Sequence, residues 1–232
     1  MQGYREWQVL ARGTEAPGVE TLRIAPLAGE LPTFTPGQFV NVLLPALGPE
    51  SKSYSIANAR DDTAFALTVR TIGAFSRALC ALEGGARLQV SLPLGYFYQT
   101  DPARPRTLVA GGIGIVPFMS MLRSERGKQG SVDTVLLYSS RTKEDAAFLS
   151  ELDALKNERN TLHVFHFLTR AAETHGGAYV RRIGAPDLLD MDRRYPTGDF
   201  FLCGSIAFVR DMRLHLKQNG IPEERLFTES FF

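Results

Sequence analysis

The glycine-rich segment Gly111-Gly112-Ile113-Gly114 has the residue types of a phosphate-binding turn. It follows the apolar run Thr107–Ala110, whose length and branching are typical of a buried parallel strand, and it precedes a helical pattern that Pro117 opens. Glycine lets a ligand approach peptide N–H groups that a Cβ would block. A helix N-terminus above such a turn offers free N–H groups to a pyrophosphate. The candidate binding residues are Gly111, Gly112, Gly114, Ile115 and Pro117.

This turn also fits a plain connection between a strand and a helix. Pro117 stands where the dinucleotide fingerprint G-x-G-x-x-G has its third glycine. No acidic residue follows about 20 positions later to bind a ribose. The turn by itself leaves both interpretations open.

A second cluster lies on the presumed strand 51–58. Side chains alternate along a strand, so Lys52 and Tyr54 share one face, with Ser53 and Ser55 beside them. A short helix is expected over 75–82, entered through Gly73, and Ser76 places a hydroxyl in its first turn. That turn is a second candidate phosphate site, composed of Gly73, Ala74, Phe75 and Ser76. Plain barrel packing by Tyr54 and helix capping by Ser76 are the structural alternatives.

Two further groups follow strands of the second half. The run Phe200–Cys203 ends at Gly204, and the C-terminal segment carries Glu229 and Phe231. Tyr138-Ser139-Ser140-Arg141 ends another strand. The four histidines, at 163, 166, 175 and 215, have no ligand spacing, so no metal site is predicted.

The elements that position these residues fall into two kinds. Short alternating segments separated by glycine and proline turns predict an antiparallel β-barrel or sandwich over residues 1–100: 8–11, 20–24, 39–44, 64–70 and 87–92. From residue 101 to 232, strands alternate with helices, which predicts a parallel sheet with crossover helices: strands 107–110, 135–138, 162–168 and 200–202, and helices from 117, over 143–157 and over 206–218. The boundary is expected in the polar, proline-bearing stretch 99–105.

Composition excludes several classes of protein. The chain has 232 residues, of which 44% are hydrophobic and 22% charged, and a net charge of +1, which argues against nucleic-acid or membrane binding through bulk electrostatics. No apolar run approaches the roughly 20 residues of a membrane span. Two cysteines are too few for a disulfide scaffold or a four-thiolate cluster, and they favour a reducing, cytoplasmic setting.

Taken in order, these motifs resemble the ferredoxin–NADP⁺ reductase superfamily of flavoproteins, most closely the reductase components of aromatic-ring dioxygenases and O-demethylases. The motifs that carry the resemblance are Pro36-Gly37-Gln38-Phe39, Lys52-x-Tyr54-Ser55, Gly73-x-x-Ser76, Pro93-x-Gly95-x-Phe97, Gly111-Gly112-Ile113-Gly114-Ile115-x-Pro117, Cys203-Gly204 and Glu229-x-Phe231. Each is weak alone, and their shared order covers essentially the whole chain.

The resemblance implies a role for each cluster. Tyr54 would lie against a flavin ring, and Ser55 would hydrogen-bond near the ring nitrogen that receives hydride. Lys52 and the segment 73–76 would hold the flavin phosphate, although lysine lacks the bidentate fork of the arginine usual in the family. The glycine turn would bind the pyridine-nucleotide pyrophosphate, with Val116 where the family usually has threonine. Cys203 and Glu229 would flank the nicotinamide, beside Gly204, and Phe231 would cover the other flavin face. Ser55, Cys203 and Glu229 are the expected catalytic residues.

We therefore expect an FAD-dependent NAD(P)H reductase that passes electrons to a separate protein such as a ferredoxin or oxygenase component, with FMN as the alternative cofactor. Ser140 and Arg141, with Lys143 near and no acid at the strand end, favour NADPH, although Arg141 also fits a solvated loop. Two alternative functions remain: a reductase that uses free flavin as a substrate, and a non-catalytic electron-relay subunit. The sequence does not indicate the oligomeric state.

Overall fold

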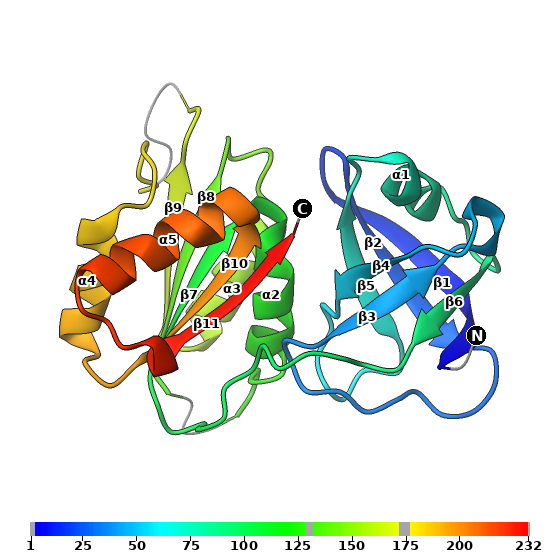
Figure 1. Ribbon diagram of the computed structural model, residues 1–232, viewed down its shortest axis with the longest axis horizontal. Helices are drawn as coiled ribbons and strands as arrows, with labels where there is room; N and C mark the ends of the chain where they lie inside the picture. The colour runs from blue at the N-terminus through cyan, green and yellow to red at the C-terminus, as the bar shows by residue number, and fades with distance from the viewer. Residues whose placement is uncertain (1–2, 129–131, 172–176, 232) are drawn as a thin grey trace. The chain divides into compact units, whose positions relative to one another are not determined.

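The alternating segments of the first half form one antiparallel sheet. The computed structural model describes residues 3–128, 132–171 and 177–231. Its first sheet has the strand order β4-β3-β6-β1-β2-β5, and a bridge between Ile56 and Leu67 joins the region after β4 to β5, so the sheet curls into a barrel (Figure 1). The strands are β1 (Tyr4–Ala16), β2 (Val19–Pro26), β3 (Phe39–Leu43), β4 (Ser51–Ser55), β5 (Phe65–Arg70) and β6 (Arg87–Ser91).

The barrel is filled by apolar side chains that point inward from these strands. Trp7 stacks on Phe65 with ring centroids 5.0 Å apart, and both side chains are fully buried. Helix α1 (Ala74–Cys80) packs on this core through Leu79 and Cys80. The 3₁₀ turn η1 (Pro45–Leu47) lies between β3 and β4.

The second sheet is parallel throughout. Its order is β11-β10-β7-β8-β9, composed of β7 (Arg106–Gly111), β8 (Thr134–Ser140), β9 (Leu162–Leu168), β10 (Asp199–Ser205) and β11 (Leu226–Phe231). Helices α4 (Ala185–Arg194) and α5 (Ile206–Gln218) cover one face, and α3 (Leu149–Glu158) lies on the other (Figure 1). Two 3₁₀ turns complete it, η2 (Gly112–Ile115) and η3 (Glu223–Arg225). The predicted fold class, an antiparallel barrel followed by a parallel α/β sheet, is confirmed.

The chain divides into two compact units. The N-terminal unit contains the described residues up to Tyr98 together with Val116–Ser124, and the C-terminal unit contains Gln99–Ile115 and the described residues from Glu125 onward. Helix α2 (Val116–Arg123) belongs with the barrel because Ser120 Oγ donates to Asn58 O at 2.8 Å and Arg123 Nη1 donates to Ala57 O at 2.7 Å. The boundary predicted between residues 100 and 101 stays a prediction.

The helix predicted over 143–157 is wrong in its first turn and a half. Asp145 N donates to Thr142 Oγ1 at 3.3 Å, the bond expected of a helix cap, but helix α3 begins only at Leu149. Ala147 N instead donates to the buried Tyr138 hydroxyl at 3.1 Å, and Phe148 adopts a left-handed conformation with φ 64°. Over 143–148, therefore, the backbone follows a tertiary hydrogen bond rather than its own tendency to form a helix.

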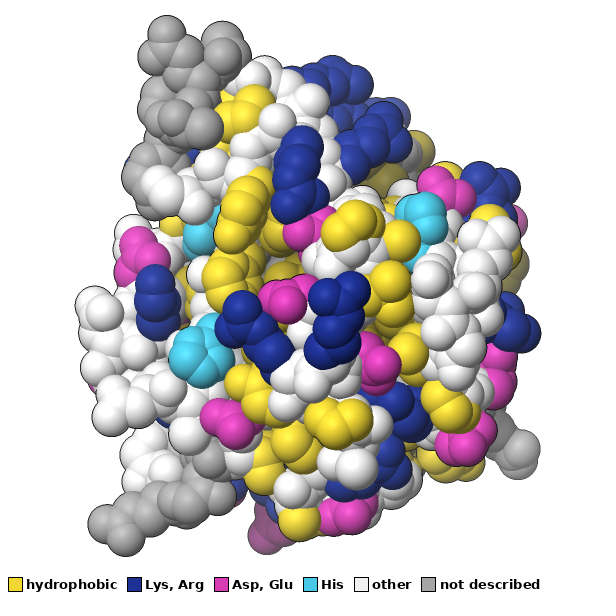
Figure 2. Space-filling model, turned by 90° about the vertical axis from the view of Figure 1, so that its left-hand side faces the viewer, with side chains coloured by type: hydrophobic (Ala, Val, Ile, Leu, Met, Phe, Trp, Pro, Cys, Tyr) yellow, Lys and Arg dark blue, Asp and Glu magenta, His cyan; other side chains and the backbone are white. Residues whose placement is uncertain are grey.

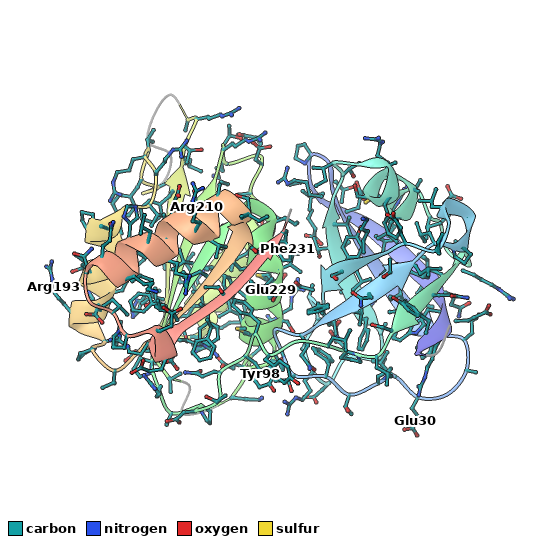
Figure 3. All side chains as sticks on the ribbon, viewed as in Figure 1. Glu30, Tyr98, Arg193, Arg210, Glu229 and Phe231 are labelled. Carbon is teal, nitrogen blue, oxygen red and sulfur yellow. The ribbon has the colours of Figure 1, made fainter. Side chains whose placement is uncertain are left out.

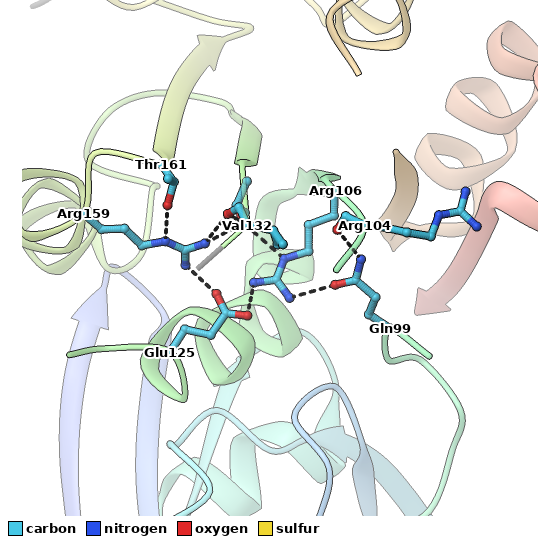
Figure 4. A network of polar contacts seen from close by, with 8 residues as sticks. Gln99, Arg104, Arg106, Glu125, Val132, Arg159 and Thr161 are labelled. Atoms are coloured by element: carbon cyan, nitrogen blue, oxygen red, sulfur yellow. Dashed lines mark hydrogen bonds and ion pairs between the residues drawn. The ribbon is translucent and has the colours of Figure 1, made fainter. Parts of the chain in front are cut away.

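At the amino ends of the parallel strands, a buried ion network holds neighbouring segments together (Figure 4). The carboxylate of Glu125 pairs with both Arg106 and Arg159. Arg159 also donates to Val132 O at 2.7 Å and to Thr161 Oγ1 at 2.9 Å. One carboxylate thereby pairs with two guanidinium groups, and the network links the starts of β7, β8 and β9.

Candidate functional site: the clusters of the two units

In the barrel, Tyr54 and Ser55 end β4. Tyr54 lies opposite Val40 in the pairing of β4 with β3, and its half-buried ring stacks on Phe75 of α1 with centroids 6.4 Å apart and planes 23° apart. Burial raises the pKa of the Tyr54 hydroxyl, so the phenol stays neutral. The structure thus brings two predicted flavin-binding residues, Tyr54 and Phe75, into contact.

Ser55 provides a test of whether this cluster suits a flavin. Its hydroxyl oxygen is buried and has no hydrogen-bond partner among the described residues. A buried hydroxyl normally finds a partner, because an unpaired one costs about 1–3 kcal/mol. A flavin ring nitrogen is such a partner, and the residues of this cluster therefore fit the cofactor.

Three side chains of the barrel that were predicted to bind the cofactor make contacts within the protein instead: Lys52, Ser53 and Ser76. Lys52 is exposed and lies 3.5 Å from Glu50, and Ser53 Oγ donates to Asn41 Oδ1 at 2.7 Å. Ser76 Oγ accepts from the amides of Ile72 and Gly73, both at 3.0 Å, and donates to Gly73 O. Its hydroxyl is therefore occupied by the cap of α1. The phosphate-binding groups that remain in this turn are the first backbone amides, at Ala74 and Phe75.

In the C-terminal unit, the glycine turn forms the 3₁₀ turn η2, and the structure explains its small residues by packing. A Cβ at Gly114 would lie 2.2 Å from Cys203 O, so η2 rests directly on the backbone of β10. A Cβ at Gly111 would lie 2.8 Å from the Phe208 ring. Gly112 has φ +55° and open space around it, and Ile115 is fully buried. Pro117 occupies the second position of α2, as expected for the first helical turn.

At the carboxyl edge of the same sheet, Cys203 on β10 pairs in register with Glu229 on β11. Figure 3 shows Glu229 and Phe231 along β11. Burial, with Glu229 nearby, holds the pKa of the Cys203 thiol well above its usual range. Burial also raises the pKa of Glu229 to about 7, and its Oε2 is buried without a hydrogen bond in the described part of the chain. The strand β11 itself was not predicted.

The end of β8 carries the predicted nucleotide-selecting residues, Ser140 and Arg141. Ser140 is buried and its hydroxyl donates to Thr142 O at 2.9 Å, so it shapes its own loop. Arg170 N donates to Arg141 O at 2.8 Å, which brings two exposed arginines together. Sequence reasoning missed Arg170. Its signal was a cation two residues after the predicted strand 162–168, at the edge where β8 also ends. His175 lies outside the described residues. Among the residues that the structure describes, no cluster of three or more His, Cys, Asp or Glu side chains could hold a metal ion.

Comparison with known proteins agrees with this arrangement. A family model described as an oxidoreductase NAD-binding domain matches residues 108–214. Ferredoxin–NADP reductase B of Sorangium cellulosum is 32% identical over 230 residues, which cover 93% of each chain. The chain belongs to the ferredoxin–NADP⁺ reductase family. The expected recognition, made from motif order, is confirmed.

Two other members show the breadth of this family. The toluate 1,2-dioxygenase electron transfer component of Pseudomonas putida is 25% identical, and the match covers 96% of this chain and 64% of that protein. A ferredoxin NADP⁺ reductase from Neisseria gonorrhoeae, solved with bound FAD and NADP, has the same fold, with a TM-score of 0.83, 22% identity and full coverage of both chains. This ferredoxin–NADP⁺ reductase family member is an FAD-dependent NAD(P)H oxidoreductase.

Proposed function

We propose that this reductase takes hydride from NADPH onto FAD and passes the electrons to a separate ferredoxin or oxygenase component. A flavin, when bound, accepts a hydride and releases electrons one at a time. The observation that carries the choice of NADPH is the backbone hydrogen bond from Arg170 N to Arg141 O, which places two exposed arginines at the ends of adjacent strands. Two guanidinium groups at adjacent strand ends suit the extra phosphate that distinguishes NADPH from NADH.

The residues of each cluster then have distinct tasks. Tyr54 packs against the flavin ring, Ser55 donates a hydrogen bond to it, and the amides at the start of α1 face its phosphate. Gly111–Ile115 receive the dinucleotide pyrophosphate. Cys203 and Glu229 lie beside the nicotinamide, with Gly204 next to Cys203, and Phe231 follows Glu229 on β11. Glu229, whose pKa is about 7, can hold or release a proton near neutral pH.

A comparison of the two donors tests the proposal. Arg141→Gln and Arg170→Gln are each expected to raise KM for NADPH about 10- to 100-fold, because a charged hydrogen bond contributes about 1.5–3 kcal/mol. KM for NADH should change little. Arg193→Gln is the control, since Arg193 is an exposed arginine in the last turn of α4 (Figure 3). Equal effects on both donors, or a wild type that prefers NADH, would contradict the choice of NADPH.

A second candidate, a reductase that uses free flavin as substrate, is favoured by one observation. Lys52 is exposed, and the Ser76 hydroxyl caps the N-terminus of α1. Side chains therefore bind a flavin phosphate more weakly than the motif implies. Flavin that stays bound through purification and gel filtration supports the first candidate. Activity that appears only when flavin is added supports the second.

The acceptor is proposed from the relatives, which include an electron transfer component of a dioxygenase. On the face of the C-terminal unit shown in Figure 2, basic and acidic side chains are interspersed. The same unit contains the ion pairs Arg181–Asp187 and Arg194–Asp190. Both cysteines are free thiols, which supports the proposed cytoplasmic location. No helix in the described residues is long and apolar enough to cross a membrane.

A further inference from the structure

Phe208, in the first turn of α5, lies across the carboxyl ends of two neighbouring strands. A Cβ at Gly111, at the end of β7, would meet its ring atoms Cδ1 and Cγ at 2.8 Å and Cδ2 at 3.1 Å. A Cβ at Gly204, in β10, would meet its Cδ1 at 2.9 Å. Real Cβ atoms almost never approach another heavy atom within 3.0 Å. Any side chain at either glycine therefore requires the ring to move.

The ring is itself held from several sides. Phe208 N donates to the Oγ of Ser205, the N-cap residue of α5, at 3.3 Å. The side chain is partly buried and packs against the core of the C-terminal unit. The start of α5 therefore holds its backbone, and the core of the C-terminal unit contacts its side chain.

The same region anchors the other end of the glycine turn. A Cβ at Gly114 would lie 2.2 Å from the carbonyl oxygen of Cys203 and 2.7 Å from the amide of Gly204. The turn thus rests on β10 at Gly114 and is bounded by the Phe208 ring at Gly111. Both contacts help to set the distance between the turn and Cys203.

We propose that Phe208 is a positioning residue for the pyridine nucleotide, and that Gly111 is glycine to admit its ring rather than to admit the ligand. By holding the end of β7 against β10, the ring sets the distance between the amides of the turn and Cys203. A dinucleotide that spans from pyrophosphate to nicotinamide must match that distance. A turn that is already ordered binds the dinucleotide without the free-energy cost of ordering the turn. This inference rests on the nucleotide site of the proposed function.

Four proteins test it: the wild type, Gly111→Ala, Phe208→Ala and the double variant. The dissociation constant for NADP⁺ is measured by calorimetry well below the melting temperature of each protein. We expect Gly111→Ala to weaken binding at least tenfold in the wild type and to have no further effect when Phe208 is alanine. Phe208→Ala alone should weaken binding severalfold, and Phe208→Leu, which keeps apolar bulk at this site, should do so less.

Gly204→Ala provides an internal contrast. A Cβ there would also lie 3.1 Å from Gly111 O, which is backbone and cannot withdraw. Phe208→Ala should therefore rescue Gly204→Ala only in part.

Three results would overturn the proposal. The first is an equal loss of affinity from Gly111→Ala in both backgrounds, which would assign this glycine to ligand approach. The second is a Phe208→Ala variant with a lower melting temperature but wild-type affinity, which would leave the ring a purely structural role. The third is failure of both Gly111→Ala and the double variant to fold. Recovery of folding in the double variant alone would support it. A wild type that binds neither NADP⁺ nor NAD⁺ would instead refute the proposed function. In that case the melting temperatures of the single and double variants would still show whether the Phe208 ring packs against Gly111.

Discussion

Cys203 and Glu229 are register partners on adjacent parallel strands, β10 and β11. The thiol is fully buried, and the carboxyl group carries a buried oxygen without a hydrogen bond in the described chain. Burial raises the pKa of both groups, so both favour the protonated form. The carboxyl edge of the sheet therefore presents an uncharged pair at slightly acidic pH and gains one negative charge near pH 7.

Glu229→Gln should change how stability depends on pH. The pKa of Glu229 is about 7 in the folded protein against 4.5 ordinarily, so the folded state binds its proton more tightly. Wild-type stability is then highest below pH 4.5 as far as this group is concerned, and falls as pH rises to about 7, by roughly 2–3 kcal/mol. The glutamine variant lacks this loss. Its free energy of unfolding relative to that of the wild type should therefore be higher at pH 8 than at pH 4.5, as measured by urea unfolding at several pH values.

The control for this change is Glu224→Gln, at an exposed carboxylate in η3. It should follow the wild-type pH profile. If Glu229→Gln also follows that profile, the carboxyl group is not desolvated as described.

Glu125→Ala should destabilise the fold. It removes a carboxylate that pairs with both Arg106 and Arg159, whose side chains are only 5% and 13% exposed. Leaving buried cations unpaired typically costs about 3–5 kcal/mol. Denaturant unfolding of Glu125→Ala measures this cost, and Glu158→Ala, which removes the exposed pair with Arg126, should leave stability nearly unchanged. Similar losses in the two variants would refute the role of the network.

Gly114→Ala should destabilise the protein by at least about 3 kcal/mol, since the added methyl group meets backbone atoms of Cys203 that cannot withdraw. Gly13→Ala, in β1 with nothing within 4 Å of its added Cβ, should change stability by no more than about 0.5 kcal/mol. The comparison is made by thermal and urea unfolding. A Gly114→Ala protein as stable as Gly13→Ala would mean that η2 does not rest on β10.

Ser55→Ala should slow flavin reduction by NADPH about tenfold with little change in melting temperature, because a lost hydrogen bond is worth about 1–1.5 kcal/mol. Ser51→Ala, on the same strand, is the matched control. Stopped-flow absorbance under anaerobic conditions gives both rates. Reduction at the wild-type rate in Ser55→Ala would remove this residue from the mechanism.

Local signals in the sequence predicted those elements that local interactions determine. Helix α5 was predicted with its observed bounds because Ser205 caps its start, and Gly220, with φ +81°, follows its end. Strand β9 was also predicted with its observed bounds, since five of its seven residues are apolar and so short a run is typical of a strand.

Contacts between distant segments account for what sequence reasoning missed. The start of α3 depends on the hydroxyl of Tyr138, which lies on a different element from Ala147. Strand β11 is defined by its pairing with β10, and the consecutive polar residues at 228–230 give no alternating pattern in the sequence. The contact of Phe208 with Gly111 joins residues 97 positions apart, and a glycine alone does not reveal which group occupies its missing Cβ.

The most direct test of the central claim is anaerobic titration of the purified protein with NADPH while its visible spectrum is recorded. The account predicts flavin absorbance in the protein as purified, with FAD released on denaturation. It also predicts rapid bleaching by NADPH, slower bleaching by NADH, and return of the colour when a one-electron acceptor protein is added. A colourless protein that leaves NADPH unoxidised, even with added FAD, would contradict the account.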